Sequence, residues 1–131
     1  MCEHTPRQEV VLPLDATAPA AARAWLRVVN CSTHSGALMD DATLLVSELV
    51  TNAVRYGGPP IVLAVDCDGV ALDVRVRDGA ADLPVPRPVT SDAEDGRGYV
   101  LLDMISDRWG VEPELQGMQG KEVWFHLRAH D

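Results

Sequence analysis

The chain has 131 residues, of which 47% are hydrophobic and 24% charged, which suits a single domain, 1–131, with a core of its own. Its formal net charge is −9. An acidic surface repels nucleic acid and anionic membranes, so we expect no direct contact with either. The three cysteines form no C-x-x-C pair, and the N-terminus does not resemble a signal peptide. We therefore expect a soluble, cytoplasmic protein.

The first half of the chain predicts one strand followed by two helices. Pro19 suits the first turn of a helix, and Asp40 or Asp41 suits the N-cap of the next one. The run 57-GGPP-60 stops that second helix, since glycine and proline end helices. The expected elements are a strand at 8–14, a helix at 19–30, a loop at 31–40 and a helix from 41 to about 56.

The second half predicts a hairpin, a long loop, one helix and a final strand pair. In the run 70-VALDVRVRD-78, apolar and polar residues alternate, as in a strand with one buried face. Pro, Asp, Ser and Gly dominate 79–97, which excludes a regular element there and is typical of functional or mobile loops. The expected elements are strands at 61–69 and 70–78 with a turn at 68–69, the loop at 79–97, a helix from 98 to about 107, and strands at 108–115 and 121–129.

The resulting order is strand, helix, helix, two strands, loop, helix, two strands. Consecutive strands joined by tight turns pair antiparallel, and they need helices on one face to bury their apolar side. The sequence therefore predicts an α+β fold with an antiparallel or mixed sheet and helices layered on one face. It excludes a doubly wound parallel sheet.

The helix expected at 41–56 carries a polar stripe on an otherwise apolar surface. Glu48, Asn52 and Arg55 stand at i, i+4 and i+7 and therefore project from one side. Two interpretations remain open: the stripe is the solvent face of an amphipathic helix, or it lines a pocket. A carboxylate and a carboxamide one turn apart can accept a proton and ligate a hard cation. Mg²⁺ that bridges phosphates needs only one or two such ligands, and Arg55 would meet phosphate charge.

Four stretches resemble, in order, the motifs of the GHKL superfamily, which includes Hsp90, sensor histidine kinases and bacterial anti-sigma-factor serine kinases. The run 48-ELVTNAVRYG-57 resembles the N-box, and Asp78 ends a strand where the family has its adenine-binding aspartate. The run 95-DGRGYVLLDMISDRWG-110 resembles the G-x-G-L box after the ATP lid, and 120-GKEVWFHL-127 resembles the last strand pair. The resemblance is nearest to kinases of the SpoIIAB and RsbW kind. It implies a two-layer α/β sandwich with a mixed, mostly antiparallel sheet.

The resemblance assigns roles to individual residues of a site for ATP and Mg²⁺. Glu48 would be the general base, and Asn52 would ligate the Mg²⁺. Asp78 would receive the adenine amino group, because guanine presents a carbonyl at that position. Gly96 and Gly98 would let backbone N–H groups approach phosphate oxygens at a helix N-terminus. The charged residues expected near the phosphates are Arg55, Arg97 and Lys121.

Two motifs depart from the family's pattern. The box D-x-G-x-G reads 78-DGAAD-82, so both later glycines are absent where the ATP lid, at about 79–97, would begin. Glu122 follows Lys121 where relatives often carry threonine, and a carboxylate near phosphates is unfavourable unless it points outward on its strand. These departures bear on nucleotide affinity and on movement of the lid.

The leading functional expectation is an ATP-binding regulator that resembles anti-sigma-factor kinases. The resemblance implies that the domain binds a sigma factor and phosphorylates a serine or threonine of an antagonist protein, with Glu48 as the base. Two alternatives remain open. One is a non-catalytic module that binds ATP or a partner protein, which the relaxed glycine box favours. The other is a detached catalytic domain of a histidine kinase. The oligomeric state is also left open, and a homodimer is one possibility.

Overall fold

The computed structural model describes residues 5–29, 36–67, 71–79, 93–113 and 120–128, and these form three helices and five strands. In chain order the elements are β1 (Thr5–Leu12), α1 (Ala18–Val29), α2 (Gly36–Tyr56), β2 (Ile61–Cys67), β3 (Ala71–Asp78), α3 (Ala93–Ile105), β4 (Arg108–Pro113) and β5 (Lys121–Arg128). The predicted order of strands and helices is confirmed. The turn expected at 68–69 lies outside the described residues.

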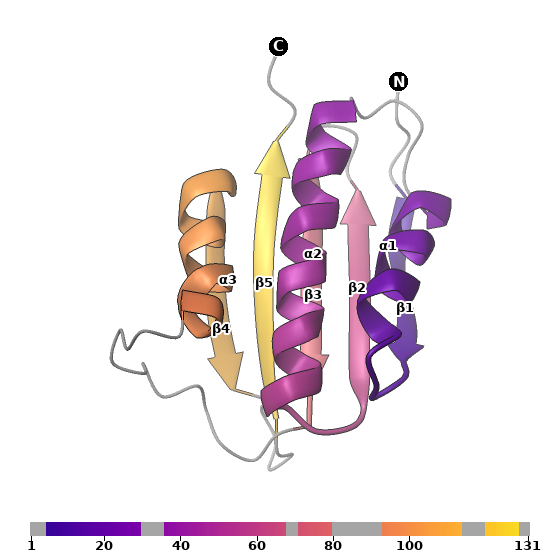
Figure 1. Ribbon diagram of the computed structural model, residues 1–131. Coiled ribbons are helices and arrows are strands. Elements are labelled where there is room, and N and C mark those ends of the chain that lie inside the picture. Colours follow the sequence, from indigo (N-terminus) through magenta and orange to yellow (C-terminus); the bar gives the residue numbers. More distant parts are fainter. Residues whose placement is uncertain (1–4, 30–35, 68–70, 80–92, 114–119, 129–131) are drawn as a thin grey trace.

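The strands form one sheet in the order β1-β2-β3-β5-β4, and every pairing between described strands is antiparallel. Figure 1 shows α1, α2 and α3 on one face of this sheet, with α2 over its centre. This is the predicted two-layer α+β arrangement, with a sheet that is antiparallel throughout its described part. Because β5 lies between β3 and β4, the start of β5 is brought beside the end of β3.

The alternating pattern of β3 sets the two faces of the sheet. Leu72, Val74 and Val76 are buried in the core under the helices. The residues between them are only half-buried, because they point to the other face, which no described helix covers. We call that side the open face. The predicted strand with one buried side is therefore confirmed.

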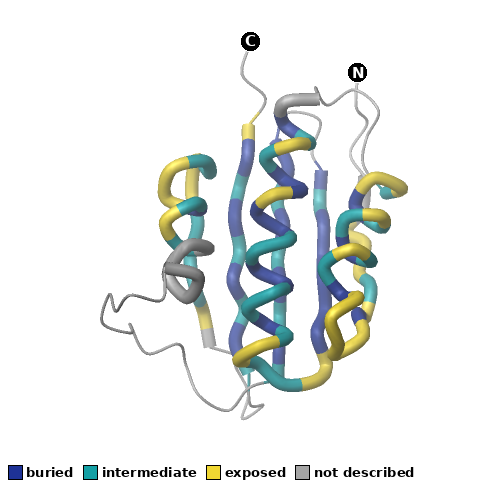
Figure 2. Tube along the Cα trace, viewed as in Figure 1, coloured by how far each residue is buried: buried dark blue, intermediate teal, exposed yellow. Residues whose placement is uncertain are grey.

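α2 contributes more buried side chains to the core than either flanking helix, and Figure 2 shows its sheet-facing side as buried. Each fully buried Leu or Val side chain stabilises the fold by about 1.5–3 kcal/mol. The buried α2 side chains are Leu38, Ala42, Thr43, Leu45, Val46, Leu49, Val50 and Ala53. Within the described residues, no helix is both long enough and apolar enough to cross a membrane.

α2 begins earlier than the sequence predicted. It starts at Gly36, so Asp40 and Asp41 lie inside the helix and the N-cap assigned to them is wrong. The reason is packing: Leu38 and Ala42 are buried, at 5% and 0% exposure, and extend the apolar face one turn further back. Burial of that extra turn outweighed the local capping preference of the aspartates.

α3 also begins earlier than predicted. The helix starts at Ala93, so residues 93–97 are helical and the loop expected at 79–97 is shorter than the sequence indicated. The sequence is acidic at positions 94 and 95, and acidic residues are common in the first turn of a helix because the helix dipole favours negative charge there. The rest of that predicted loop, residues 80–92, lies outside the described residues.

Candidate functional site

Three elements that carry predicted nucleotide residues meet at one end of the sheet. Figure 1 shows the end of α2, the end of β3 and the start of β5 at the same end of the sheet. The Gly79 N–H donates a hydrogen bond of 2.8 Å to the carbonyl oxygen of Gly58, which ties the segment after β3 to the segment after α2. The N-box helix and the strand-end aspartate, separate in sequence, are thus held together.

Asp78 is buried where these elements meet. Its exposure is only 3%, although it carries a carboxylate at a strand end. Gly57 permits this close packing: a Cβ added there would lie 2.7 Å from the Asp78 Cγ and 2.6 Å from the Ala53 carbonyl oxygen. A glycine is therefore required where α2 ends against the aspartate.

Lys121 forms an ion pair with that carboxylate. It stands directly opposite Asp78 in the β3–β5 pairing, and its Nζ lies 3.3 Å from the Asp78 Oδ2. Both side chains are buried, with exposures of 11% and 3%. Buried charges are tolerated when they are paired, and here each charge has the other. Sequence reasoning expected Lys121 near phosphates and did not foresee this contact.

Tyr99 is a neighbour of the candidate site that sequence reasoning missed. It is half-buried on α3, and its ring lies 5.6 Å from that of Trp109. Burial, and then the negative charge of Asp78, raise the pKa of the Tyr99 phenol. The only signal in the sequence was an aromatic residue directly after the glycine pair at 96–98.

Replacing Asp78 by Asn is expected to bring the pKa of Tyr99 closer to its ordinary value of 10.0, because one of the two causes of the increase is removed. Burial remains, so the pKa stays raised. The pKa of Tyr99 is higher in the folded protein than in the unfolded one. The stability linked to this difference is fully present while the pH is below the unfolded pKa, and it is lost as the pH rises through the folded pKa. Alkaline titration by phenolate absorbance measures it, with Tyr56→Phe to remove the other tyrosine. An unchanged titration in Asp78→Asn would contradict the proximity of the two groups.

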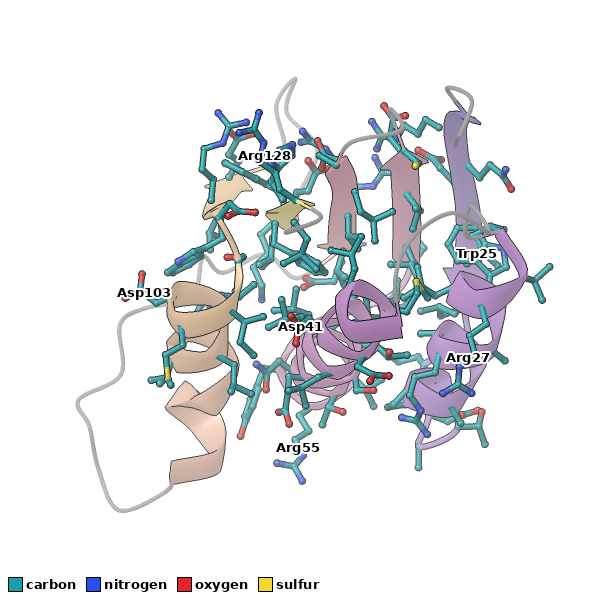
Figure 3. All side chains as sticks on the ribbon, turned by 90° about the horizontal axis from the view of Figure 1, so that it is seen from above. Trp25, Arg27, Asp41, Arg55, Asp103 and Arg128 are labelled. Carbon is teal, nitrogen blue, oxygen red and sulfur yellow. The ribbon has the colours of Figure 1, made fainter. Side chains whose placement is uncertain are left out.

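The polar stripe of α2 faces away from the sheet. Glu48 and Asn52 are half-buried, and Arg55 is exposed and points away from the sheet in Figure 3. Arg23 of α1 donates a 3.0 Å hydrogen bond to the Ser47 hydroxyl, so the Ser47 edge of the stripe faces α1. Asn52 lies about 140° further round the helix, at 100° per residue, and so leans toward α3, which packs on the other side of α2. Glu48 and Asn52 therefore do not lie on a wholly solvent-exposed face, and the pocket that they would line stays a prediction.

The glycine pair expected at the phosphates lies in α3. Gly96 and Gly98 fall within its first two turns, together with Arg97, whose side chain is outside the described residues. Each glycine in a helix interior costs about 1 kcal/mol relative to alanine. The start of α3 is therefore easier to unwind than its remainder.

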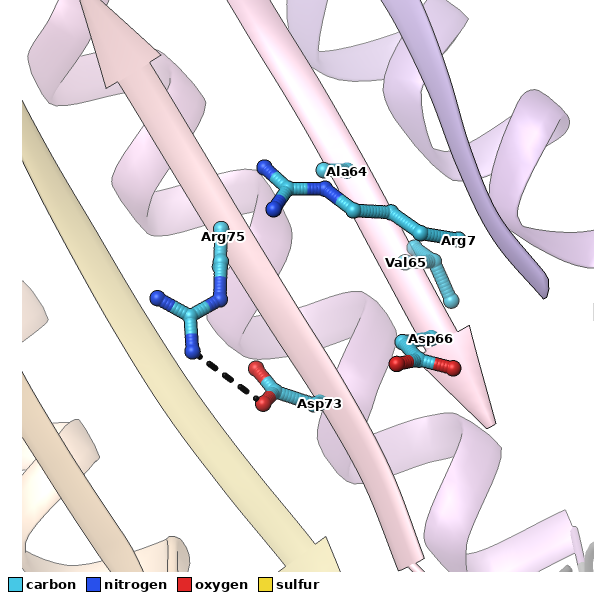
Figure 4. A pocket seen from close by; sticks show the side chains of 6 residues that line it. All are labelled: Arg7, Ala64, Val65, Asp66, Asp73 and Arg75. Carbon is cyan, nitrogen blue, oxygen red and sulfur yellow. Dashed lines mark hydrogen bonds and ion pairs between the residues drawn. The ribbon is translucent and has the colours of Figure 1, made fainter. Parts of the chain in front are cut away.

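Two hollows in the described part of the chain lie away from this junction. One, of about 130 Å³, lies among Arg7, Ala64, Val65, Asp66, Asp73 and Arg75, where Figure 4 shows Arg75 paired with Asp73 at 3.3 Å. The other lies among Asp107, Arg108, His126 and Arg128. Neither contains a residue predicted to bind nucleotide, and the first is lined by ion-paired side chains of the open face.

The described residues contain no cluster of three or more His, Cys, Asp or Glu side chains that could hold a metal ion. A Mg²⁺ ion bound together with a nucleotide does not need such a cluster, because it keeps several waters and takes oxygens from the phosphates. The carboxamide oxygen of Asn52 on the half-buried side of α2 is of the kind that Mg²⁺ accepts.

The chain is similar to known proteins over most of its length. Residues 12–127 match the family described as histidine kinase-like ATPase domain. No curated protein sequence matches the chain significantly. Among solved structures, the RsbU and RsbW domains of Rv1364c from Mycobacterium tuberculosis have a TM-score of 0.62 and 20% identity, over 95% of this chain and 32% of that one. Acinetobacter baumannii histidine kinase AdeS has a TM-score of 0.53 and 8% identity, over 95% of this chain and 68% of that one.

At these identities the two solved structures establish the fold alone, and the chain spans only 32% of the length of the Mycobacterium tuberculosis chain. The family match is broader evidence, because it runs from the end of β1 into β5 and includes α2, Asp78 and Lys121. It agrees with the GHKL motifs and with the antiparallel sheet under three helices. The chain belongs to the histidine kinase-like ATPase domain family.

Proposed function

We propose that this domain binds ATP with Mg²⁺ at the junction of α2, β3 and α3 and acts as a regulatory protein kinase of the anti-sigma-factor kind. The observation that carries the proposal is the buried carboxylate of Asp78, packed against the end of the helix that bears Glu48 and Asn52. A buried carboxylate at the floor of a site can receive the exocyclic amine of adenine. Family membership supports ATP as the nucleotide.

The spacing of residues along α2 supports different roles for Asn52 and Glu48. Gly57 packs on Asp78 at the end of α2 where the adenine base would bind, which we call the base end. Asn52 stands five residues before Gly57, so the Asn52 side chain lies about 7 Å along the helix axis from the base end. Glu48 lies about 6 Å further along. In this arrangement Asp78 binds the base, Asn52 ligates the Mg²⁺ beside the phosphates, and Glu48 reaches the substrate beyond them. Arg55 and Arg97 would contact phosphate oxygens, and the backbone N–H groups of Gly96 and Gly98 would do so once the start of α3 unwinds.

Glu48 acts as the general base in this proposal. Its carboxylate takes the proton of a serine or threonine hydroxyl, whose oxygen forms a bond to the γ-phosphorus. The bond from that phosphorus to the β–γ bridging oxygen breaks, and ADP leaves with the electron pair. Positioning and neutralisation of charge supply most of the rate in such transfers.

The acceptor protein is proposed to be an antagonist of an anti-sigma factor, with a sigma factor as the second partner. The fold likeness to a chain with an RsbW domain supports this class of regulator. Such a protein would act in the cytoplasm, where ATP and sigma factors are found.

A non-catalytic binding module is the second candidate. The sequence 78-DGAAD-82 favours it, because the lid segment lacks the glycines that allow sharp hinging. The two candidates share ATP binding and differ only in phosphoryl transfer. A trans-acting histidine-kinase catalytic domain, the third possibility, would differ in phosphorylating histidine.

Mg·ATP is expected to stabilise the wild-type protein, by about 2.7 kcal/mol at a free concentration one hundred times Kd. Asn52→Ala should remove the part of this stabilisation that depends on Mg²⁺ while the fold survives, because Asn52 is half-buried and outside the core. Thermal unfolding with ATP, with ATP and Mg²⁺, and with ATP and EDTA measures the difference.

Thr51→Ala is the matched control for Asn52→Ala. Thr51 neighbours Asn52 on α2, and its hydroxyl donates to the Ser47 carbonyl oxygen at 2.7 Å, within the helix itself. The control should lower stability slightly and leave the response to Mg·ATP intact. Absence of any shift in the wild type at millimolar Mg·ATP would remove the nucleotide-binding proposal.

A further inference from the structure

We propose that Lys121 recognises the base: its ammonium group donates a hydrogen bond to the ring N1 of adenine, beside the contact between the adenine amine and Asp78. The proposal rests on the proposed function, since it assumes that adenine lies at Asp78. It assigns Lys121 to the base end of the site, where sequence reasoning had expected it near the phosphates.

The position of Lys121 follows from the sheet. Asp78 and Lys121 are directly opposite each other in the β3–β5 register, on the same face as the buried pairs Val76–Val123 and Val74–Phe125. Side chains directly opposite each other in an antiparallel pair have Cβ atoms about 4.5–5.5 Å apart. The pairing thus places both charged groups at one spot under the helices, and the 3.3 Å contact confirms that they meet.

The two groups form an acceptor beside a donor. A carboxylate has about four lone-pair sites and an ammonium has three N–H bonds, so their mutual contact leaves each able to bind a further group. The edge of adenine that carries the exocyclic amine presents a donor, N6–H, next to an acceptor, N1. The Asp78 carboxylate would accept a hydrogen bond from N6–H, and the Lys121 ammonium would donate one to N1.

The same order disfavours guanine at both positions. Guanine carries a carbonyl oxygen where adenine has its amine, and an N1–H where adenine has a lone pair. In the adenine pose the carbonyl would face the Asp78 carboxylate, and the N1–H would face the Lys121 ammonium. Buried polar groups that lose their partners carry a large penalty, so a site built this way discriminates strongly.

Burial keeps the Lys121 ammonium at the base end. Its side chain is 11% exposed, and the carboxylate that it contacts is 3% exposed. Movement of the ammonium toward phosphates would leave Asp78 as a buried charge without this cation, which is strongly unfavourable. Contact with the base edge requires no such separation, because the ion pair stays together.

The test compares Mg·ATP with its analogue in which carbon replaces N1, 1-deaza-ATP, by calorimetric titration of the whole chain. Wild-type protein is expected to bind ATP about 10- to 100-fold more tightly than the analogue, the size of one hydrogen bond to a charged donor. In Lys121→Met this preference should fall to about 1, because the variant has no donor for N1. The ratio of ATP to ADP affinity, which reports phosphate contacts, should not change.

Arg128→Met is the matched control, since Arg128 is an exposed cation at the other end of the same strand. It should leave both ratios at their wild-type values. Equal wild-type affinity for ATP and the analogue would overturn the inference and leave the proposed function standing, and this comparison does not depend on whether Lys121→Met folds. A changed ATP-to-ADP ratio in Lys121→Met, with the preference for ATP over the analogue retained, would instead place Lys121 at the phosphates. Absence of binding of either nucleotide to the wild type would remove the proposed function itself.

Discussion

Replacement of Glu48 by Gln is expected to slow phosphoryl transfer by about 10²–10⁴-fold, the usual effect of losing a general base. Nucleotide affinity should stay nearly unchanged, because in the proposed arrangement Glu48 lies beyond Asn52, away from the base end at Asp78. The glutamine keeps the shape of the side chain and removes only its ability to take a proton. Single-turnover transfer of radiolabelled phosphate to the acceptor protein, together with calorimetric titration of Mg·ATP, measures both quantities.

Asp40→Asn provides the matched control, because Asp40 is an exposed carboxylate on the same helix, two turns before Glu48. It should change neither the transfer rate nor the affinity. If Glu48→Gln weakens ATP binding as much as Asn52→Ala does, Glu48 serves the metal or the structure of the pocket. If the wild type transfers no phosphate to a partner whose sigma regulation it affects, the non-catalytic module is the correct function.

The architecture could be predicted from sequence because local patterns determine it. Alternation in β3 defined a strand with one buried face, and tight connections defined antiparallel neighbours. The starts of α2 and α3 could not be placed in the same way. Leu38 looks like a loop residue beside two potential N-cap aspartates, and only its burial in the assembled core shows that the helix continues past them.

Individual residues of the candidate site could be predicted from sequence, but the contacts between them could not. Asp78 and Asn52 were predicted from sequence as site residues, and the structure places them near the ends of β3 and α2, at the same end of the sheet. The contact between Lys121 and Asp78 depends on β5 inserting between β3 and β4, which no local pattern encodes. Tyr99 was missed for the same reason, since its relation to Asp78 exists only after α3 packs against α2.

Replacement of Asp78 by Asn is expected to lower the free energy of unfolding by about 3–5 kcal/mol, because it leaves the Lys121 ammonium buried without its carboxylate. The same change should also abolish tight binding of ATP, since an amide is a weaker acceptor for the adenine amine than a carboxylate. Stability and binding are separated by the double variant Asp78→Asn with Lys121→Met. Removal of both charges should restore most of the stability, because a neutral pair has no buried ion to solvate. The double variant should still bind ATP poorly.

Glu122→Gln is the control for charge removal in the same sheet. Glu122 pairs with Arg75 at 2.8 Å on the open face, where the two side chains are 15% and 32% exposed. Arg75 keeps its ion pair with Asp73 when Glu122 is changed, so the loss should cost only about 1 kcal/mol. Urea unfolding of the four proteins and calorimetric titration with Mg·ATP provide the measurements. A loss of stability in Asp78→Asn no larger than in Glu122→Gln would show that the Asp78–Lys121 pair is not buried in solution. Wild-type affinity for ATP in Asp78→Asn would show that the base is held by other residues, because the carboxylate is the acceptor that the proposed site requires.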